Sequence, residues 1–184
     1  MSGSMTRRMK IINKNGVTLI ELIIVVSIIG ILVIALGFSF QGWIGRYGAE
    51  SLIKEMNTDL MNGKVSAMQK NRTYFVRLTT TRYTVYEDTN PAPDGDGLLQ
   101  TASDRRIRQK ELQPNGPITW SGATAQIEFN KKGIADNDKT ICINKDVDAD
   151  YDCIEIAALK INAGKLTTRI FSGGACNATN CVAK

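Results

Sequence analysis

The most constraining feature of this sequence is an apolar run from Val17 to Phe40, 24 residues in which Glu21 is the only charged side chain. As an α-helix this run would be about 36 Å long, enough to cross the ~30 Å hydrocarbon core of a bilayer. It is too long for the apolar region of a secretory signal peptide, and no A-x-A-like cleavage site follows it. The sequence therefore predicts a transmembrane anchor at residues 17–40.

The charges in front of the run predict its orientation. Residues 1–16 contain four basic residues and no acidic one: Arg7, Arg8, Lys10 and Lys14. By the positive-inside rule the N-terminus lies in the cytoplasm and the bulk of the chain lies outside it. The whole chain has 23 basic and 18 acidic residues, a formal net charge of +5, and without residues 1–16 the basic count falls to 19. The net charge therefore indicates membrane topology more than nucleic-acid binding.

Glu21 stands out because a carboxylate in an apolar helix is costly and marks a candidate functional site. A simpler interpretation is a capping box, because Thr18-x-x-Glu21 directly precedes the run. Capping alone does not account for the glycine at position 16 or for the basic leader.

The segment Gly16, Val17-Thr18-Leu19-Ile20-Glu21-Leu22 resembles the prepilin-type cleavage and methylation motif, whose usual form is Gly followed by Phe-Thr-Leu-Ile-Glu-Leu. The resemblance implies that a membrane prepilin peptidase cuts after Gly16, removes residues 1–16 as a leader and methylates Val17. It also implies that Glu21 acts in assembly by pairing with the new amino terminus of a neighbouring subunit. A buried carboxylate is tolerable when it is paired in this way. Val17 departs from the usual Phe.

The rest of the chain predicts an α+β fold. Apolar residues recur at three- and four-residue steps through residues 41–72, so one helix would continue from about Val17 to about Asn71. From residue 73 to 184 the period changes to two, which predicts a β-rich globular domain with an antiparallel sheet packed on the amphipathic half of the helix. The last two predicted strands form a hairpin about Ala163-Gly164.

This order of elements resembles the H-type minor pseudopilins of type II secretion and the FimT/FimU minor pilins. The points of likeness include Ile127-x-Phe129-x-x-x-Gly133 and the closing hairpin Ala163-Gly164-Lys165-Leu166. The implied location is the inner membrane, with a periplasmic C-terminal domain, and then a filament. The implied partners are other pilin or pseudopilin subunits, the prepilin peptidase and an inner-membrane assembly platform.

Four cysteines in a chain without histidine predict two disulfides more readily than a metal site, and hence an oxidising compartment. Three connectivities are possible. The spacing favours Cys142–Cys153 across an acidic hairpin and Cys176–Cys181 within a C-terminal loop.

Two charged clusters are candidate binding sites. Alternating acids at Asp146, Asp148, Asp150 and Asp152 suggest a Ca²⁺ loop. The EF-hand template fails, however, because Tyr151 takes the glycine position and Ala157 the bidentate position, and a solvated strand face is the favoured interpretation. The loop Asp94-Gly-Asp96-Gly97 is a similar candidate.

The second cluster is basic: Arg105, Arg106, Arg108 and Lys110. It is the best candidate for binding a phosphate backbone, although charges on an edge strand that deter aggregation are the favoured interpretation. No nucleophile–base pair, phosphate loop or cofactor motif is found in the sequence. The chain is therefore expected to be a structural subunit of a pilus or pseudopilus and not an enzyme; a DNA-binding minor pilin and a non-polymerising anchored domain are the alternatives.

Overall fold

The computed structural model describes residues 16–112 and 116–184, with the side chains of residues 35–41 left aside. Most of the predicted leader, residues 1–15, lies outside the described residues. The chain divides into two compact units, one ending at Phe40 and the other running from Gln41 to Lys184. Helix α1, Leu19–Lys70, supplies the described helix of the first unit and the first element of the second.

Local sequence explains where α1 begins and ends. At its start the hydroxyl Oγ1 of Thr18 accepts a hydrogen bond from the backbone N–H of Glu21 at 3.3 Å, as an N-cap does. At its end Asn71 takes a left-handed conformation with φ 51°, and the N–H of Arg72 turns back to the carbonyl of Ala67 at 3.2 Å. Asparagine is one of the few residues that tolerates this helix-ending conformation.

In the part of the chain that the structure describes, no helix is both long and apolar enough to cross a membrane. The predicted anchor includes residues 35–40, which are among those whose side chains are not described.

Nine strands form two antiparallel sheets among the described residues of the second unit. The first sheet has the order β3-β2-β1-β5 and the second the order β4-β6-β7-β8-β9. The strands of the first sheet are β1 Tyr74–Thr79, β2 Arg82–Glu87, β3 Arg105–Glu111 and β5 Gln126–Phe129. Those of the second are β4 Ile118–Trp120, β6 Lys139–Ile143, β7 Cys153–Ile156, β8 Ile161–Leu166 and β9 Cys181–Ala183, with a short 3-10 helix at Ile170–Ser172 before β9.

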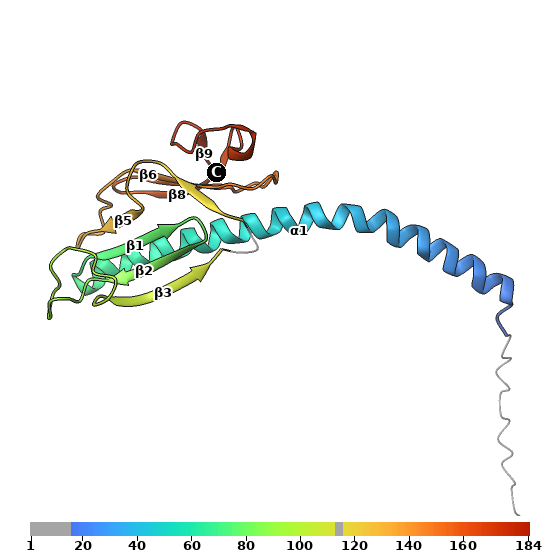
Figure 1. Ribbon diagram of the computed structural model, residues 1–184, viewed down its shortest axis with the longest axis horizontal. Helices are drawn as coiled ribbons and strands as arrows, with labels where there is room; N and C mark the ends of the chain where they lie inside the picture. The colour runs from blue at the N-terminus through green and yellow to red at the C-terminus, as the bar shows by residue number, and fades with distance from the viewer. Residues whose placement is uncertain (1–15, 113–115) are drawn as a thin grey trace, which may run out of the picture. The chain divides into compact units, whose positions relative to one another are not determined.

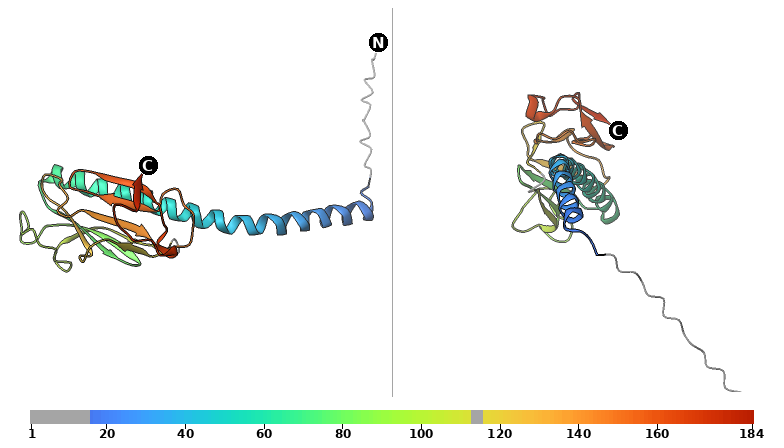
Figure 2. Two further views of the ribbon diagram at one scale, coloured as in Figure 1. Left: turned by 90° about the horizontal axis from the view of Figure 1, so that it is seen from above. Right: turned by 90° about the vertical axis from the view of Figure 1, so that its right-hand side faces the viewer.

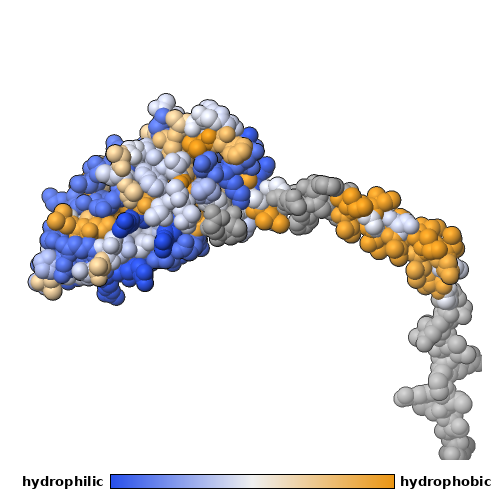
Figure 3. All heavy atoms as spheres, in the orientation of Figure 1, coloured by the Kyte–Doolittle hydropathy of each residue, from blue (hydrophilic) through white to orange (hydrophobic). Residues whose placement is uncertain are grey.

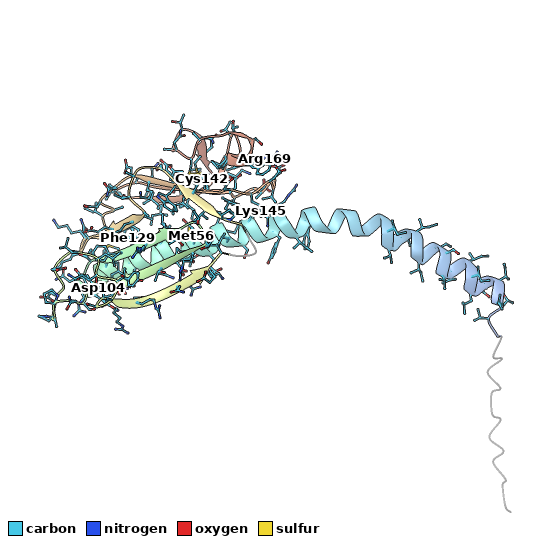
Figure 4. All side chains as sticks on the ribbon, in the orientation of Figure 1. Met56, Asp104, Phe129, Cys142, Lys145 and Arg169 are labelled. Carbon is cyan, nitrogen blue, oxygen red and sulfur yellow. A yellow bond between two sulfur atoms is a disulfide. The ribbon has the colours of Figure 1, made fainter. Side chains whose placement is uncertain are left out.

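The second half of α1 lies between the two sheets, with β1–β3 on one side and β6 and β8 on the other (Figures 1 and 2). One core of buried side chains joins all three layers; Leu52, Met56 and Leu60 of α1 have 0–1% of their surface exposed. Figure 4 labels Met56 and Phe129 within this core. The α+β prediction of one long helix packed on antiparallel strands is confirmed, with two sheets where one was expected.

The predicted closing hairpin about Ala163-Gly164 is wrong. Strand β8 runs straight through both residues, and the turn lies earlier, where the N–H of Ala157 bonds to the carbonyl of Lys160. Gly164 instead lets β9 approach: a Cβ there would lie 2.4 Å from the carbonyl oxygen of Val182. A glycine inside a strand often marks such a close backbone approach, and the sequence pattern alone does not separate it from a turn.

The predicted disulfide pairing is also wrong. The bonds are Cys142–Cys176 and Cys153–Cys181, with Cα–Cα distances of 5.8 and 6.0 Å. Cys142 and Cys153 are cross-strand partners on β6 and β7, and the segment that ends in β9 packs against the same cluster of buried side chains, with Leu166 and Ile170. Each strand cysteine therefore bonds to the covering segment. Both bonds tie the C-terminus to the sheet, which short-range pairing would not do.

Candidate processing and assembly site

The predicted cleavage point lies immediately before α1. Gly16, Val17 and Thr18 are exposed and precede the first helical residue, Leu19, so the Gly16–Val17 peptide bond is neither buried nor helical. Because Thr18 caps the helix, the boundary between extended chain and helix is set two residues after that bond.

Neither packing nor backbone conformation explains the glycine at position 16. A Cβ placed there would meet no atom within 4 Å, and its φ does not lie in the left-handed region. A larger residue would therefore fit the described part of the structure, and no contact or backbone strain among the described residues requires glycine there.

Glu21 lies in the first turn of α1 and is exposed. Its backbone N–H donates a hydrogen bond to the hydroxyl of Thr18, so Thr18 caps the helix as the capping-box interpretation expects. Among the described residues its carboxylate has no hydrogen-bond or ion-pair partner, so the reciprocal half of a capping box is not formed. The carboxylate therefore remains available for a partner that the described chain does not supply.

The helix after Glu21 is apolar around its whole circumference. From Leu22 to Ile34 every Leu, Ile and Val side chain is about half exposed or more, between 49% and 69% (Figure 3). The hydroxyl of Ser27 donates to the carbonyl of Ile23 at 2.8 Å, so this polar group is satisfied within the helix. A helix that is apolar on all sides needs an apolar environment.

The basic candidates do not form one patch. Strand β3 is an edge strand, and a bulge opposite Val85/Tyr86 leaves Ile107 unpaired. Arg108 and Arg106 therefore lie opposite two consecutive residues of β2, and their side chains are on different faces of the sheet. Arg106 lines a depression of about 370 Å³ with Arg77 and Arg82. Arg108 and Lys110 turn to α1. Arg105 lies 3.8 Å from Glu87, a buried carboxylate.

Arg108 and Lys110 are held by two acidic residues of α1, Glu55 and Asp59. The Arg108 Nε lies 2.6 Å from an oxygen of Asp59, and one terminal nitrogen lies 2.7 Å from Glu55. Lys110 is 2.7 Å from Glu55, and the hydroxyl of Tyr83 donates to Asp59 at 2.6 Å. Burial, together with this hydrogen bond to Asp59, raises the pKa of Tyr83, and the hydrogen bond from Lys110 leads the groups that lower the pKa of Glu55. These side chains dock β3 on α1; the signal in the sequence was the spacing of Glu55 and Asp59, one helical turn apart.

The acids of the 146–152 segment are paired or buried. Asp146 lies 2.9 Å from Arg169, Asp148 3.0 Å from Lys165, and Asp150 3.0 Å from Lys184. Asp152 is buried and accepts a hydrogen bond from the N–H of Leu166 at 2.6 Å. Figure 4 places Arg169 and Cys142 on the same side of the domain. Over the described residues no group of three or more acidic or cysteine side chains could hold a metal ion.

The second acidic loop, at residues 94–97, is folded around its own backbone. Asp96 accepts from the N–H of Leu98 at 2.9 Å, and Asp88 accepts from the N–H of Gly97 at 2.7 Å. Asp104 accepts from the N–H groups of Thr89 and Gln100. These carboxylates shape the loop after β2, and Figure 4 labels Asp104 at its end.

Comparison with known proteins addresses the N-terminal motif directly. Residues 12–37 match the family model described as the prokaryotic N-terminal methylation motif. The N-terminus carries this methylation motif. The match covers the leader end, Gly16, Val17 and Glu21 together, and so contains every residue of the predicted processing and assembly site.

Three solved structures resemble part of this chain. The type IV minor pilin FimU of Pseudomonas aeruginosa is 15% identical, with 64% of this chain and 89% of that chain covered and a TM-score of 0.49. Two crystal structures of the minor pseudopilin EpsH, from the type II secretion system of Vibrio cholerae, are 13% and 11% identical. They cover 62% and 64% of this chain and 94% and 96% of theirs, with TM-scores of 0.46 and 0.47. A search of curated proteins finds no match.

Proposed function

We propose that this chain is a structural subunit of a filament, a minor pilin of a type IV pilus or a minor pseudopilin of type II secretion. The observation that carries the proposal is the methylation motif over residues 12–37. In this proposal a prepilin peptidase cuts after Gly16 and methylates Val17, and an inner-membrane assembly platform then adds the subunit to a filament of other pilin or pseudopilin subunits.

The arrangement at the cleavage point supports this role. An exposed, non-helical Gly16–Val17 bond is accessible to a peptidase, and a glycine that the fold does not require is consistent with recognition of that residue by an enzyme. The apolar helix after it would anchor the chain in the inner membrane, with the disulfide-bonded domain in the periplasm, before packing into a filament core. Both destinations supply the apolar surroundings that residues 22–34 need.

In this proposal Glu21 forms an ion pair with a neighbouring subunit. Cleavage would create a cationic amine on Val17, and pairing of Glu21 with the amine of a neighbouring subunit would neutralise both charges as the helix leaves lipid. The chain's own described residues offer Glu21 no partner, consistent with a partner in another subunit.

The test expresses the full chain with and without a prepilin peptidase and follows its intact mass. The expected product lacks residues 1–16 and carries one added methyl group. Glu21→Ala and the isosteric Glu21→Gln should both be processed but fail to enter filaments. Glu50→Gln, an acid on the same helix that binds the domain backbone, should be incorporated normally. Normal incorporation of Glu21→Ala would overturn the assigned role of Glu21, and an uncut chain would overturn the proposal as a whole.

A further inference from the structure

An aromatic pair lies on α1 just after the apolar run. Trp43 and Tyr47 are 62% and 64% exposed, and their rings stack with centroids 5.9 Å apart. Ile44 between them is 59% exposed. Of the ten aromatic side chains that the structure describes, only these two and Phe171 are mostly exposed.

The pair faces away from the folded domain. Positions four apart on a helix differ by about 40° around its axis, so Trp43 and Tyr47 share one side, whereas Gly45 lies about 200° from Trp43. Gly45 is the residue that approaches the domain, because a Cβ there would lie 3.2 Å from Val147. Ala49 and Leu52, with 0% and 1% of their surface exposed, continue that inner side.

Water is a poor environment for this patch. Stacking covers only part of the two rings, because both side chains remain more than half exposed, and apolar surface left in water gains nothing from burial. Two aromatic rings and an isoleucine side by side therefore indicate that this face is covered in the working protein.

We infer that Trp43 and Tyr47 form an interfacial anchor, lying at the headgroup level of the bilayer and fixing how deeply the helix inserts. The inference rests on the proposed membrane-anchored role. Trp and Tyr are enriched at this level because each ring has an apolar body and one polar group. Trp43 follows the end of the 24-residue apolar run by three residues, which is where a helix that crosses the hydrocarbon core reaches the interface.

The charges around the pair agree with a lipid surface. No acidic residue occurs between Glu21 and Glu50, and the carboxylate of Glu50 accepts the backbone N–H of Asp150 at 3.0 Å. Asp148 and Asp150 beside this turn are neutralised by Lys165 and Lys184, and Arg46 adds a further favourable charge near both. This end of the domain therefore presents few uncompensated carboxylates to the anionic headgroups of a bilayer.

The experiment uses the fluorescence of Trp43 in the full chain. Trp120 is the only other tryptophan, so Trp120→Phe leaves Trp43 as the sole reporter. The protein is reconstituted into vesicles of phosphatidylethanolamine and phosphatidylglycerol, with a quencher attached to the lipid either near the headgroup or at the end of the acyl chain. Flotation of the vesicles measures separately whether the chain is anchored.

The expected result is flotation of the chain and quenching of Trp43 about twofold stronger with the headgroup-level quencher than with the acyl-chain quencher. The matched control adds Phe171→Trp to a chain with Trp43→Phe and Trp120→Phe, placing an equally exposed tryptophan on the domain; this reporter should stay unquenched. Tyr47→Ser should shift the Trp43 quenching profile, whereas Ser51→Ala one turn further on should not.

The outcomes separate the inference from the proposed function. A chain that floats while Trp43 is unquenched, or is quenched mainly from the acyl-chain end, overturns the interfacial anchor and leaves the membrane anchor standing. A chain that does not float overturns the anchor at residues 17–40 as well. If Trp43 emission shifts to the blue with protein concentration in detergent without lipid, a second copy of the chain covers the pair, and the lipid assignment is wrong.

Discussion

At the residue scale, Asp88 is a buried carboxylic acid directly after β2. It is 1% exposed, and its Oδ1 is buried without a hydrogen-bond partner among the described residues. Gly95, with φ 75°, lies so close that a Cβ there would overlap the carboxylate. Burial raises the pKa of Asp88, and the nearby carboxylates of Asp104 and Asp96 raise it further, against a hydrogen bond from Gly97 that lowers it.

A raised pKa in the folded chain sets the sign of the pH effect. The contribution of Asp88 to stability is fully present below the ordinary aspartate pKa of about 3.9 and is lost as pH rises through the higher folded value. Asparagine does not ionise, so Asp88→Asn does not lose stability in this way as the pH rises. The melting temperature of Asp88→Asn minus that of the parent chain should therefore be more positive at about pH 7 than at about pH 4.

Calorimetry or circular dichroism at the two pH values checks this prediction. The matched control is Asp94→Asn, an exposed aspartate in the same loop, whose offset from the parent should change little with pH. Equal offsets for Asp88→Asn at both pH values would show that the buried carboxyl does not titrate differently in the folded chain.

At the element scale, Arg108 is the residue of β3 that contacts both acids of α1, Glu55 and Asp59. Arg108→Ala should lower the free energy of unfolding by about 2 kcal/mol, because it removes charge-assisted hydrogen bonds and leaves Asp59, which is 8% exposed, with Tyr83 as its one partner among the described residues. Arg106→Ala should change it by less than about 0.5 kcal/mol, because Arg106 is exposed and, within the described ranges, hydrogen-bonds only to Gln109.

Urea unfolding measures both variants, and a gel-shift titration with duplex DNA at two salt concentrations adds a second readout. A similar small change in stability for the two arginines would contradict the docking role. If the chain binds DNA strongly and in a salt-sensitive way, and Arg108→Ala alone abolishes that binding, the interpretation of this cluster as a binding site for a phosphate backbone would be supported.

The pairing of the cysteines determines which elements the disulfides connect. Cutting after Lys and Arg yields peptides 140–145 and 146–160 with one cysteine each, and 170–184 with two. The observed pairing links all three in one species that separates on reduction. The short-range pairing would instead link only the first two and leave 170–184 alone, so mass spectrometry of the unreduced digest distinguishes them.

The two bonds close separations of 34 and 28 residues, so each should stabilise the chain by about 4 kcal/mol through the entropy of the unfolded state. Replacing Cys153 and Cys181 together by alanine should therefore release β9 and lower stability by about that amount.

At the scale of the whole molecule, the boundary at Phe40/Gln41 predicts which truncations fold. A chain of residues 41–184 keeps the whole core, whose first buried residue is Ala49. It should unfold cooperatively, with a melting temperature close to that of the full chain in detergent.

A chain of residues 61–184 is the matched contrast. It loses Leu52, Ile53, Met56 and Leu60, each 0–1% exposed between the two sheets. Large cavities of this kind cost several kcal/mol per residue, so this shorter chain should not fold. Near-ultraviolet circular dichroism compares the two, and a folded 61–184 would show that the sheets do not need the helix.

The sequence by itself determined the features that depend on neighbours along the chain. The prepilin-type motif, the helix cap at Thr18, the three- and four-residue apolar steps of α1 and the β-forming residues of β1 and β2 all follow from local composition and spacing. The α+β fold class followed from the same patterns.

Only the tertiary structure decided the contacts between segments that are distant in sequence. The partner of each cysteine, the division of the strands into two sheets, the burial of Asp59 and the direction of Arg108 depend on which elements pack together, and many arrangements share one local pattern. Gly164 shows the reason plainly: its local sequence suits a turn, but the backbone of β9 passes so near that no side chain fits. Local preference amounts to about 1 kcal/mol per residue, so a close packing contact overrides it.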